Sequence, residues 1–279
     1  MKSNYYCTVA GLPDITLDDN KLSYTVGDMK EELYLELDKK DTALLDLFYL
    51  KYDNKNLLSL LREDQAEIDP RGVFTAEELE EMIALVRDGE ETVDGMPQYL
   101  VDAVVAYLDD KDKVVGNWED RMASAYYNYA IHAKNPFISS WFAYNLNVNN
   151  IQLALAARRH DMPYQEQIVG FTEVSKTIRV SNARDFGLSA DLDYIDALIK
   201  IDEISDLVER ERKTDLLKWN WVEEHSFFDY FTIERLFVFL VQLEMVERWL
   251  LLDKELGNQQ FRAIIQSFKD DVQIPEEFR

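Results

Sequence analysis

Apolar residues recur every three or four positions along most of this chain, which is the spacing of one face of an α-helix. The pattern is clear from Gly27 onward and predicts a succession of amphipathic helices joined by short polar connections. Residues 38–41 are polar and break the pattern, so an Asp there is predicted to cap the next helix. Residues 4–12 are aromatic and β-branched, and either a short strand or a buried first helical turn is expected.

Polar and turn-forming residues predict where the later helices begin and end. Thr75 to Glu78 has the sequence of a capping box, and Asn135-Pro136 ends one helix and starts another. Loops are predicted over 63–72 and 88–97. Further helices are predicted over 99–108, 117–132, 136–160, 164–179, 189–218 (with Leu207 and Val208 inward) and 227–256, the last ended by Gly257 and followed by a short helix around 261–268.

Two stretches 94 residues apart share one helical pattern, and they span residues 46–62 and 140–156. In both, an aromatic residue is followed five positions later by Asp or Asn, and three positions after that by an Asn that opens an aliphatic run. These positions are Phe48, Asp53 and Asn56 in the first copy, and Phe142, Asn147 and Asn150 in the second. Asp53 is predicted to be an N-cap, and the two later Asn side chains to bond free N–H groups near helix starts. A repeated helical unit without catalytic residues favours a scaffold that binds a partner.

The composition supports a helical, globular chain. Only 9 Gly and 6 Pro occur in 279 residues, which disfavours a turn-rich β fold. We therefore expect an all-α fold over residues 1–279 as a single domain. The lone cysteine, Cys7, excludes an internal disulfide and fits a reducing compartment. The start of the chain has no apolar core of a signal peptide, and charges interrupt the most apolar helix, so a soluble protein is expected.

The formal net charge of −24 excludes duplex DNA binding as the main activity, because acidic surfaces repel phosphates. The carboxylates are spread along the chain without a block of like charges, which is typical of a solvated surface. Attraction to basic protein partners is the functional alternative.

Candidate chemistry is scarce. The three histidines lie apart without metal spacing, and no phosphate loop, dinucleotide fingerprint or nucleophile elbow occurs. No catalytic, cofactor-binding or metal-binding residue is assigned. The most enzyme-like cluster is Glu223-Glu224-His225 beside two tryptophans, where a carboxylate next to a His could act as a general base. A packed helix junction is the preferred interpretation of that cluster.

The motif Phe48-x4-Asp53-x2-Asn56-Leu57-x4-Arg62 resembles the repeated helical motif of the C subunit (also called d) of V- and A-type rotary ATPases. The resemblance implies an all-helical funnel or bundle of three similar units around a pseudo-threefold axis. The corresponding units here are approximately residues 25–112, 117–218 and 219–279. The second copy departs from the motif, with Asn147 at the Asp position and Ala156 at the Arg position. A third copy is expected near residue 241, with Leu236-Phe237 at the aromatic position and Glu244 at the Asn position.

Residues 4–14 and 247–257 also resemble the two ends of a bacterial family that is similar to this subunit and accompanies rotary-ATPase genes in organisms such as Bacteroidetes. The resemblance implies a non-catalytic central-stalk subunit that couples the rotor shaft to the membrane ring during ion transport. Its partners would be stalk subunits and the ring, and its place the cytoplasmic face of the membrane. Two alternatives stay open. One is a helical adaptor or assembly factor for a membrane complex, and the other is a small-molecule enzyme that uses Glu223, Glu224 and His225.

Overall fold

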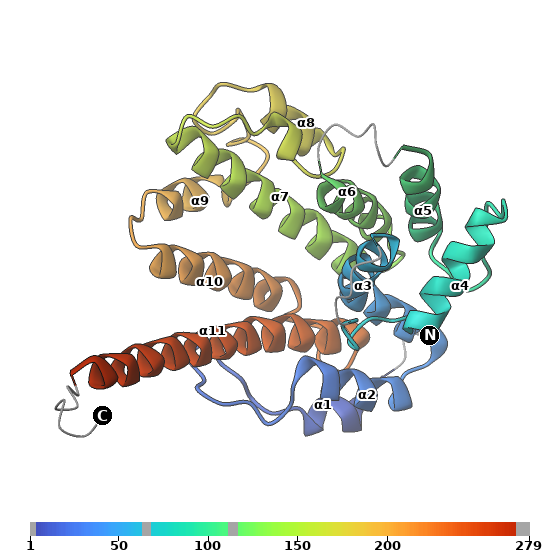
Figure 1. Ribbon diagram of the computed structural model, residues 1–279, viewed down its shortest axis with the longest axis horizontal. Coiled ribbons are helices and arrows are strands. Elements are labelled where there is room, and N and C mark those ends of the chain that lie inside the picture. The colour runs from blue at the N-terminus through green and yellow to red at the C-terminus, as the bar shows by residue number, and fades with distance from the viewer. Residues whose placement is uncertain (1–3, 63–67, 111–116, 272–279) are drawn as a thin grey trace, which may run out of the picture.

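The computed structural model describes residues 4–62, 68–110 and 117–271, with side chains described as far as residue 254 apart from that of residue 110. Within these residues the protein is all-α, as expected from the sequence, and no strand occurs (Figure 1). The elements are α1 (Tyr6–Gly11), α2 (Val26–Glu36), α3 (Lys39–Leu61), α4 (Ala76–Arg87), α5 (Gln98–Asp110), α6 (Trp118–Ile131), α7 (Pro136–Arg159), the 3-10 helix η1 (Gln165–Gln167), α8 (Glu173–Val180), α9 (Ile195–Asp202), α10 (Leu207–His225) and α11 (Ile233–Asp271).

The three longest helices, α3, α7 and α11, form the frame of the molecule. Figure 1 shows α7 and α11 spreading apart, with α9 and α10 between them. Helix α6 packs on both α3 and α7, while α4 and α5 pack against each other on the outer side of α3. Each of the three long helices carries one copy, or the expected third copy, of the sequence motif.

The three long helices begin close to one another. At the start of α7, the Asn135 side chain donates a hydrogen bond of 2.9 Å to the Glu234 carboxylate in the first turn of α11. Tyr5 links the start of α3 to the start of α11. Its hydroxyl donates to Asp41 in the first turn of α3 (2.5 Å), and its N–H donates to the Phe231 carbonyl just before α11 (2.8 Å). We call this region the closed end.

Three phenylalanines, one from each long helix, pack together near the closed end. The Phe237 ring meets Phe48 at a centroid distance of 6.2 Å and an interplanar angle of 85°, and Phe142 at 5.9 Å and 67°. Such edge-to-face contacts are favourable because the positive ring edge meets the negative face. Phe237 follows Phe142 by 95 positions, and Phe142 follows Phe48 by 94. All three rings are buried, so they form a central aromatic junction.

Several predicted helix boundaries are confirmed. The Asp38 carboxylate accepts from the N–H groups of residues 40 and 41 at the start of α3. Thr75 and Glu78 form both bonds of the capping box of α4. Asn135 caps α7, which has Pro136 in its first turn. These residues satisfy N–H groups that lack an intrahelical partner, which explains why the helices begin there.

The prediction that Asp53 begins a new helix is wrong. Helix α3 runs without a break from Lys39 to Leu61, so Asp53 and Asn56 lie in its interior and are buried. Asn150 likewise lies inside α7. These side chains do not bond the ends of their own helices. They bond loops that fold back over the helices, a partnership that a capping rule based on neighbouring residues does not anticipate.

Residues 189–218 form no single helix. Helix α9 ends at Asp202, and α10 begins at Leu207 after Asp206, whose carboxylate accepts from the N–H of Glu209 as an N-cap. The cap redirects the chain, so Leu207 and Val208 are exposed and not inward as predicted. Similarly, residues 164–179 are divided into η1 and α8, with Gly170 at a φ of +77° between them.

The C-terminal boundaries also differ from the prediction. Helix α11 begins at Ile233, six residues later than expected, and residues 227–231 form an exposed connection. It then continues through Gly257 to Asp271, so the separate short helix around 261–268 belongs to α11. A helical Gly costs only about 1 kcal/mol, which is too little to end a helix by itself. The first segment forms α1, which has no buried residue, and the strand alternative is wrong. The described helices include none that is long and apolar enough to cross a bilayer.

Candidate functional site

Two asparagines at corresponding motif positions hold the loops that follow their helices. The Asn56 amide donates to the Asp69 carbonyl (3.0 Å) and accepts from the Asp69 N–H (2.9 Å). Asn150 makes the same pair of bonds to Val169, at 2.8 and 3.0 Å. In each pair, one buried side-chain amide bonds both the N–H and the C=O of a single loop residue. We call these contacts the Asn clamps, and they give the repeated motif an architectural role.

Asp53 adds a second contact in the first unit. Its carboxylate accepts from the N–H groups of Val73 (2.7 Å) and Phe74 (3.0 Å). Burial raises the pKa of Asp53 to about 6, although these two N–H groups oppose the rise. Gly72 lies against this carboxylate, and a Cβ there would stand 2.7 Å from Asp53 Oδ1. The second unit departs here, since Asn147 donates instead to the Tyr194 hydroxyl at 3.3 Å.

Beyond the aromatic junction, the long helices separate and enclose a cavity of about 820 Å³. Its walls come from α3, α6, α7, α10 and α11. They combine aromatic rings, amides and charged groups. The charged lining residues are Lys51, Lys55, Arg71, Glu119, Glu211, Asp215, Lys218, Glu244, Glu247 and Arg248. Five are basic and five acidic, so the cavity wall is balanced in charge within a chain whose net charge is −24.

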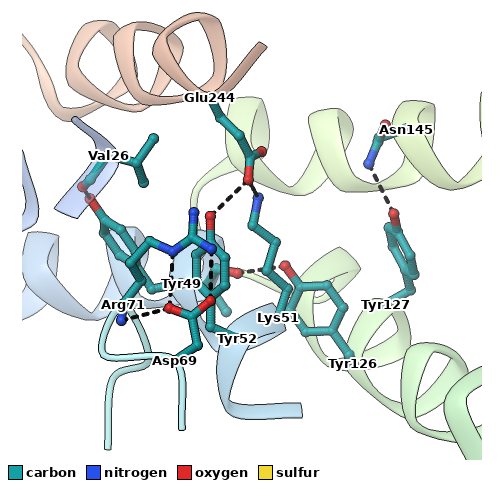
Figure 2. A network of polar contacts seen from close by, with 11 residues as sticks. Val26, Tyr49, Lys51, Tyr52, Asp69, Arg71, Tyr126, Tyr127, Asn145 and Glu244 are labelled. Atoms are coloured by element: carbon teal, nitrogen blue, oxygen red, sulfur yellow. Dashed lines mark hydrogen bonds and ion pairs between the residues drawn. The ribbon is translucent and has the colours of Figure 1, made fainter. Parts of the chain in front are cut away.

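A polar network joins two of the long helices across the cavity (Figure 2). The Glu244 carboxylate on α11 forms an ion pair with Lys51 and accepts from the Tyr52 hydroxyl at 2.9 Å, both on α3. Burial opposes ionisation of Glu244, yet Lys51 and Tyr52 hold its pKa below the ordinary value. The Lys51 ammonium also lies 4.0 Å from the centroid of the Phe48 ring. Glu244, which stands at the expected third-copy Asn position, therefore fastens α11 to α3.

Arg71 forms another part of this wall. It pairs with Asp69 through two side-chain bonds of 2.9 and 2.7 Å, which raise the pKa of Arg71 and lower that of Asp69. Its guanidinium lies 4.2 Å from the centroid of the Tyr52 ring, within the range of a cation–π contact. Because Asn56 clamps the backbone of Asp69, the first Asn clamp also positions Arg71 in the cavity wall.

The opposite wall, made by α6, α7 and α10, contains a chain of hydrogen bonds. Lys218 donates to the side-chain oxygen of Asn149 (2.7 Å), and the nitrogen of that amide donates to the Tyr127 hydroxyl (3.3 Å). Asn145 also donates to this hydroxyl, at 2.9 Å (Figure 2). Burial lowers the pKa of Lys218 to about 8.

The predicted motif residues therefore have different roles. Phe48 and Phe142 line the cavity and join the aromatic junction. Arg62 lies at the end of α3, where it pairs with Glu119 at 2.6 Å. The motif did not identify Lys51, Tyr127 or Lys218, which supply polar groups to the cavity. For Lys51 a signal existed, because it interrupts an otherwise aromatic and aliphatic stretch.

The cluster around His225 is engaged in local contacts. The His225 ring stacks on Trp221 at a centroid distance of 4.1 Å, and its Nδ1 lies 2.8 Å from the Trp221 carbonyl oxygen. Glu223 contacts Gln242 and lies 3.6 Å from Arg235. Glu223, Glu224 and His225 are not among the residues that line the cavity. In the part of the chain that the structure describes, no group of three or more His, Cys, Asp or Glu side chains has a metal-binding arrangement.

An exposed aromatic patch lies beside the closed end. It consists of Tyr6 in α1 and of Phe227, Phe228, Tyr230 and Phe231 in the connection before α11. Phe228 is 83% exposed, and the Tyr6 and Phe231 rings pack at 4.7 Å. Contiguous exposed aromatic surface is unusual on a soluble domain and often marks a contact site. None of the patch residues is among those that line the cavity.

Comparison with known proteins gives one family. Residues 1–272 match the family described as "Protein of unknown function (DUF2764)". No curated protein and no solved structure matches the chain.

Proposed function

The chain belongs to this family of unknown function, and we propose that it is a non-catalytic coupling subunit in the central stalk of a V/A-type rotary ATPase. In this role it would join the rotor shaft to the membrane ring and transmit torque during ion transport. It would be held at the cytoplasmic face of the membrane through its protein partners. The function is inferred by analogy, from the repeated motif together with the architecture. The fold alone would not be enough, because one fold can carry many unrelated functions.

One observation carries the proposal. Three long helices begin together, cross-pack through Phe48, Phe142 and Phe237, and then spread to enclose a cavity. This is the arrangement that a socket for a shaft requires, with a closed end and a lined interior. Torque transmission also requires stiffness. The Asn clamps and the half-buried Lys51–Glu244 pair supply it, because they fix loops and helices to one another through polar contacts.

The cavity and the aromatic patch are two separate surfaces, and each is assigned to one partner. The shaft would enter the cavity, whose outer lining includes the exposed apolar residues Leu251 and Leu252 on α11. The ring would contact the aromatic patch beside the closed end. Aromatic side chains are enriched at protein interfaces, and the net charge of −24 disfavours direct contact with anionic lipid.

The proposal is tested by purifying the tagged protein from its native membranes in mild detergent and identifying the bound proteins by mass spectrometry. Recovery of catalytic, stalk and ring subunits in fixed proportion is expected. Recovery of the protein alone, with the ATPase intact elsewhere in the gradient, would overturn it. Recovery only with incomplete complexes would favour the assembly-factor alternative.

A further inference from the structure

The hydrogen-bond chain in the α6–α7–α10 wall has a direction that points to a ligand. Lys218 donates to Asn149, which donates to the Tyr127 hydroxyl, and Asn145 donates to the same hydroxyl. The Tyr127 oxygen thus accepts twice, and its own proton stays available to donate. Among the described residues, none accepts a hydrogen bond from that hydroxyl. Donation along a chain strengthens the last donor, so Tyr127 offers a strengthened O–H to the cavity.

Lys218 supplies further donors at the other end of the chain. Its ammonium has three N–H groups, of which one bonds Asn149. Within the part of the chain that the structure describes, no carboxylate lies within ion-pair distance of it. Three of the other four cations of the described cavity wall differ, because Lys51, Arg71 and Arg248 each pair with a carboxylate. Lys55 forms no such pair among the described residues, but unlike Lys218 it has no hydrogen-bonded link to Tyr127. The Tyr127 proton and two protons of the Lys218 ammonium are therefore available to an acceptor on a ligand.

We propose that this wall binds a carboxylate, held between the Lys218 ammonium and the Tyr127 hydroxyl on either side of the Asn149 amide. The cavity of about 820 Å³ is far larger than a carboxylate, and its lining includes Phe142, Met245 and Leu252. The carboxylate is therefore one group on a larger ligand whose remainder contacts apolar surface. We assign it to an acidic side chain of the shaft segment that enters the cavity, and this assignment rests on the proposed function.

The surroundings of Lys218 support the proposal. The charged groups that face it are Asp215 and Glu211 from α10 itself, and Arg248 and Glu244 from α11. Burial lowers the pKa of Lys218, and the three carboxylates only partly offset the effect of burial and of Arg248. A bound carboxylate would add a negative charge beside the Lys218 ammonium and so raise the pKa of Lys218 again. Binding should then be stronger at pH 7 than at pH 9, where the free ammonium has lost its proton.

The first arm of the test uses the purified full chain and glutarate as the probe. In protein labelled with ¹³C-lysine, the Lys218 signal is assigned by its loss in Lys218→Met, and its pKa is measured by NMR. Glutarate is expected to raise this pKa by roughly one unit, a tenfold change in proton affinity. Sodium chloride at the same ionic strength should not raise this pKa. The Tyr127→Phe variant should show a smaller rise with glutarate than the wild type. An equal pKa in glutarate and chloride would overturn the carboxylate site.

The second arm identifies the source of the carboxylate. Lys218→Met and Tyr127→Phe should each weaken retention of shaft subunits about tenfold, as expected for one charge-assisted hydrogen bond. Lys213→Met, an exposed change on the same helix, is the matched control and should have no effect. A glutarate response with unchanged shaft retention would overturn the shaft as the source. A glutarate response in a wild-type protein that retains no shaft would overturn the proposed function and leave the carboxylate site standing.

Discussion

At the scale of single residues, the first Asn clamp leaves no room for a side chain at Gly72. A Cβ there would lie 2.7 Å from Asp53 Oδ1 and 3.0 Å from Asn56 Nδ2. Gly72→Ala should lower the free energy of unfolding by about 1–3 kcal/mol, because buried groups must move apart. Chemical denaturation measures the change. Gly11→Ala is the control, since nothing lies within 4 Å of a Cβ at Gly11. Equal effects of the two changes would show that the clamp tolerates a methyl group.

Asp53 gives a pH-dependent prediction. Its pKa is raised from 3.8 to about 6 in the fold, so between these values the folded protein binds more protons than the unfolded chain. The stabilising contribution is therefore complete below pH 3.8 and is lost as pH rises through 6. A shift of this size corresponds to at most about 3 kcal/mol. The wild type should lose stability relative to Asp53→Asn between pH 4 and pH 7, as measured by urea denaturation. A constant difference would contradict the raised pKa.

At the scale of the elements, the aromatic junction should bear much of the packing between the three long helices. Phe237→Ala removes a fully buried ring and should cost about 3–5 kcal/mol, with Phe237→Leu intermediate. Phe228→Ala removes the same ring from an exposed site and should change stability by less than about 0.5 kcal/mol. Thermal and urea unfolding measure both. A small effect at Phe237 would mean that the helices are held mainly by other contacts.

The same elements show what the sequence can predict. Periodicity and capping residues predict most of the helices and the starts of α3, α4 and α7, because those signals are local. They miss the breaks within residues 164–179 and 189–218. The 94-residue spacing also locates Phe237, one position from the expected register. It does not reveal that Asn56 bonds a loop residue 13 positions later, or that Asn150 bonds one 19 positions later. Nor does this spacing predict that Lys218 lines the cavity. These contacts depend on how the chain returns to its own helices, which no local pattern encodes.

At the scale of the whole molecule, the cavity and the aromatic patch should be separable by mutation if they contact different partners. Leu251 and Phe228 are both exposed, at 54% and 83%, so polar substitutions there should leave the fold intact. Leu251→Asp places a charge in the cavity wall and should reduce recovery of shaft subunits, while ring subunits are retained. Phe228→Ser removes an exposed anchor and should do the reverse. Quantitative mass spectrometry after affinity purification measures both ratios.

The control for this pair is Leu35→Asp, because Leu35 is 87% exposed on α2 and is not among the residues that line the cavity. It should leave both ratios unchanged, which separates a site-specific effect from a general loss of solubility. A coupling subunit must bind the shaft and the ring at the same time. Each variant should therefore also uncouple ATP hydrolysis from ion transport in the assembled complex. If both variants lose both partners equally, the two surfaces do not act separately. The assignment of the shaft to the cavity and the ring to the patch would then be wrong.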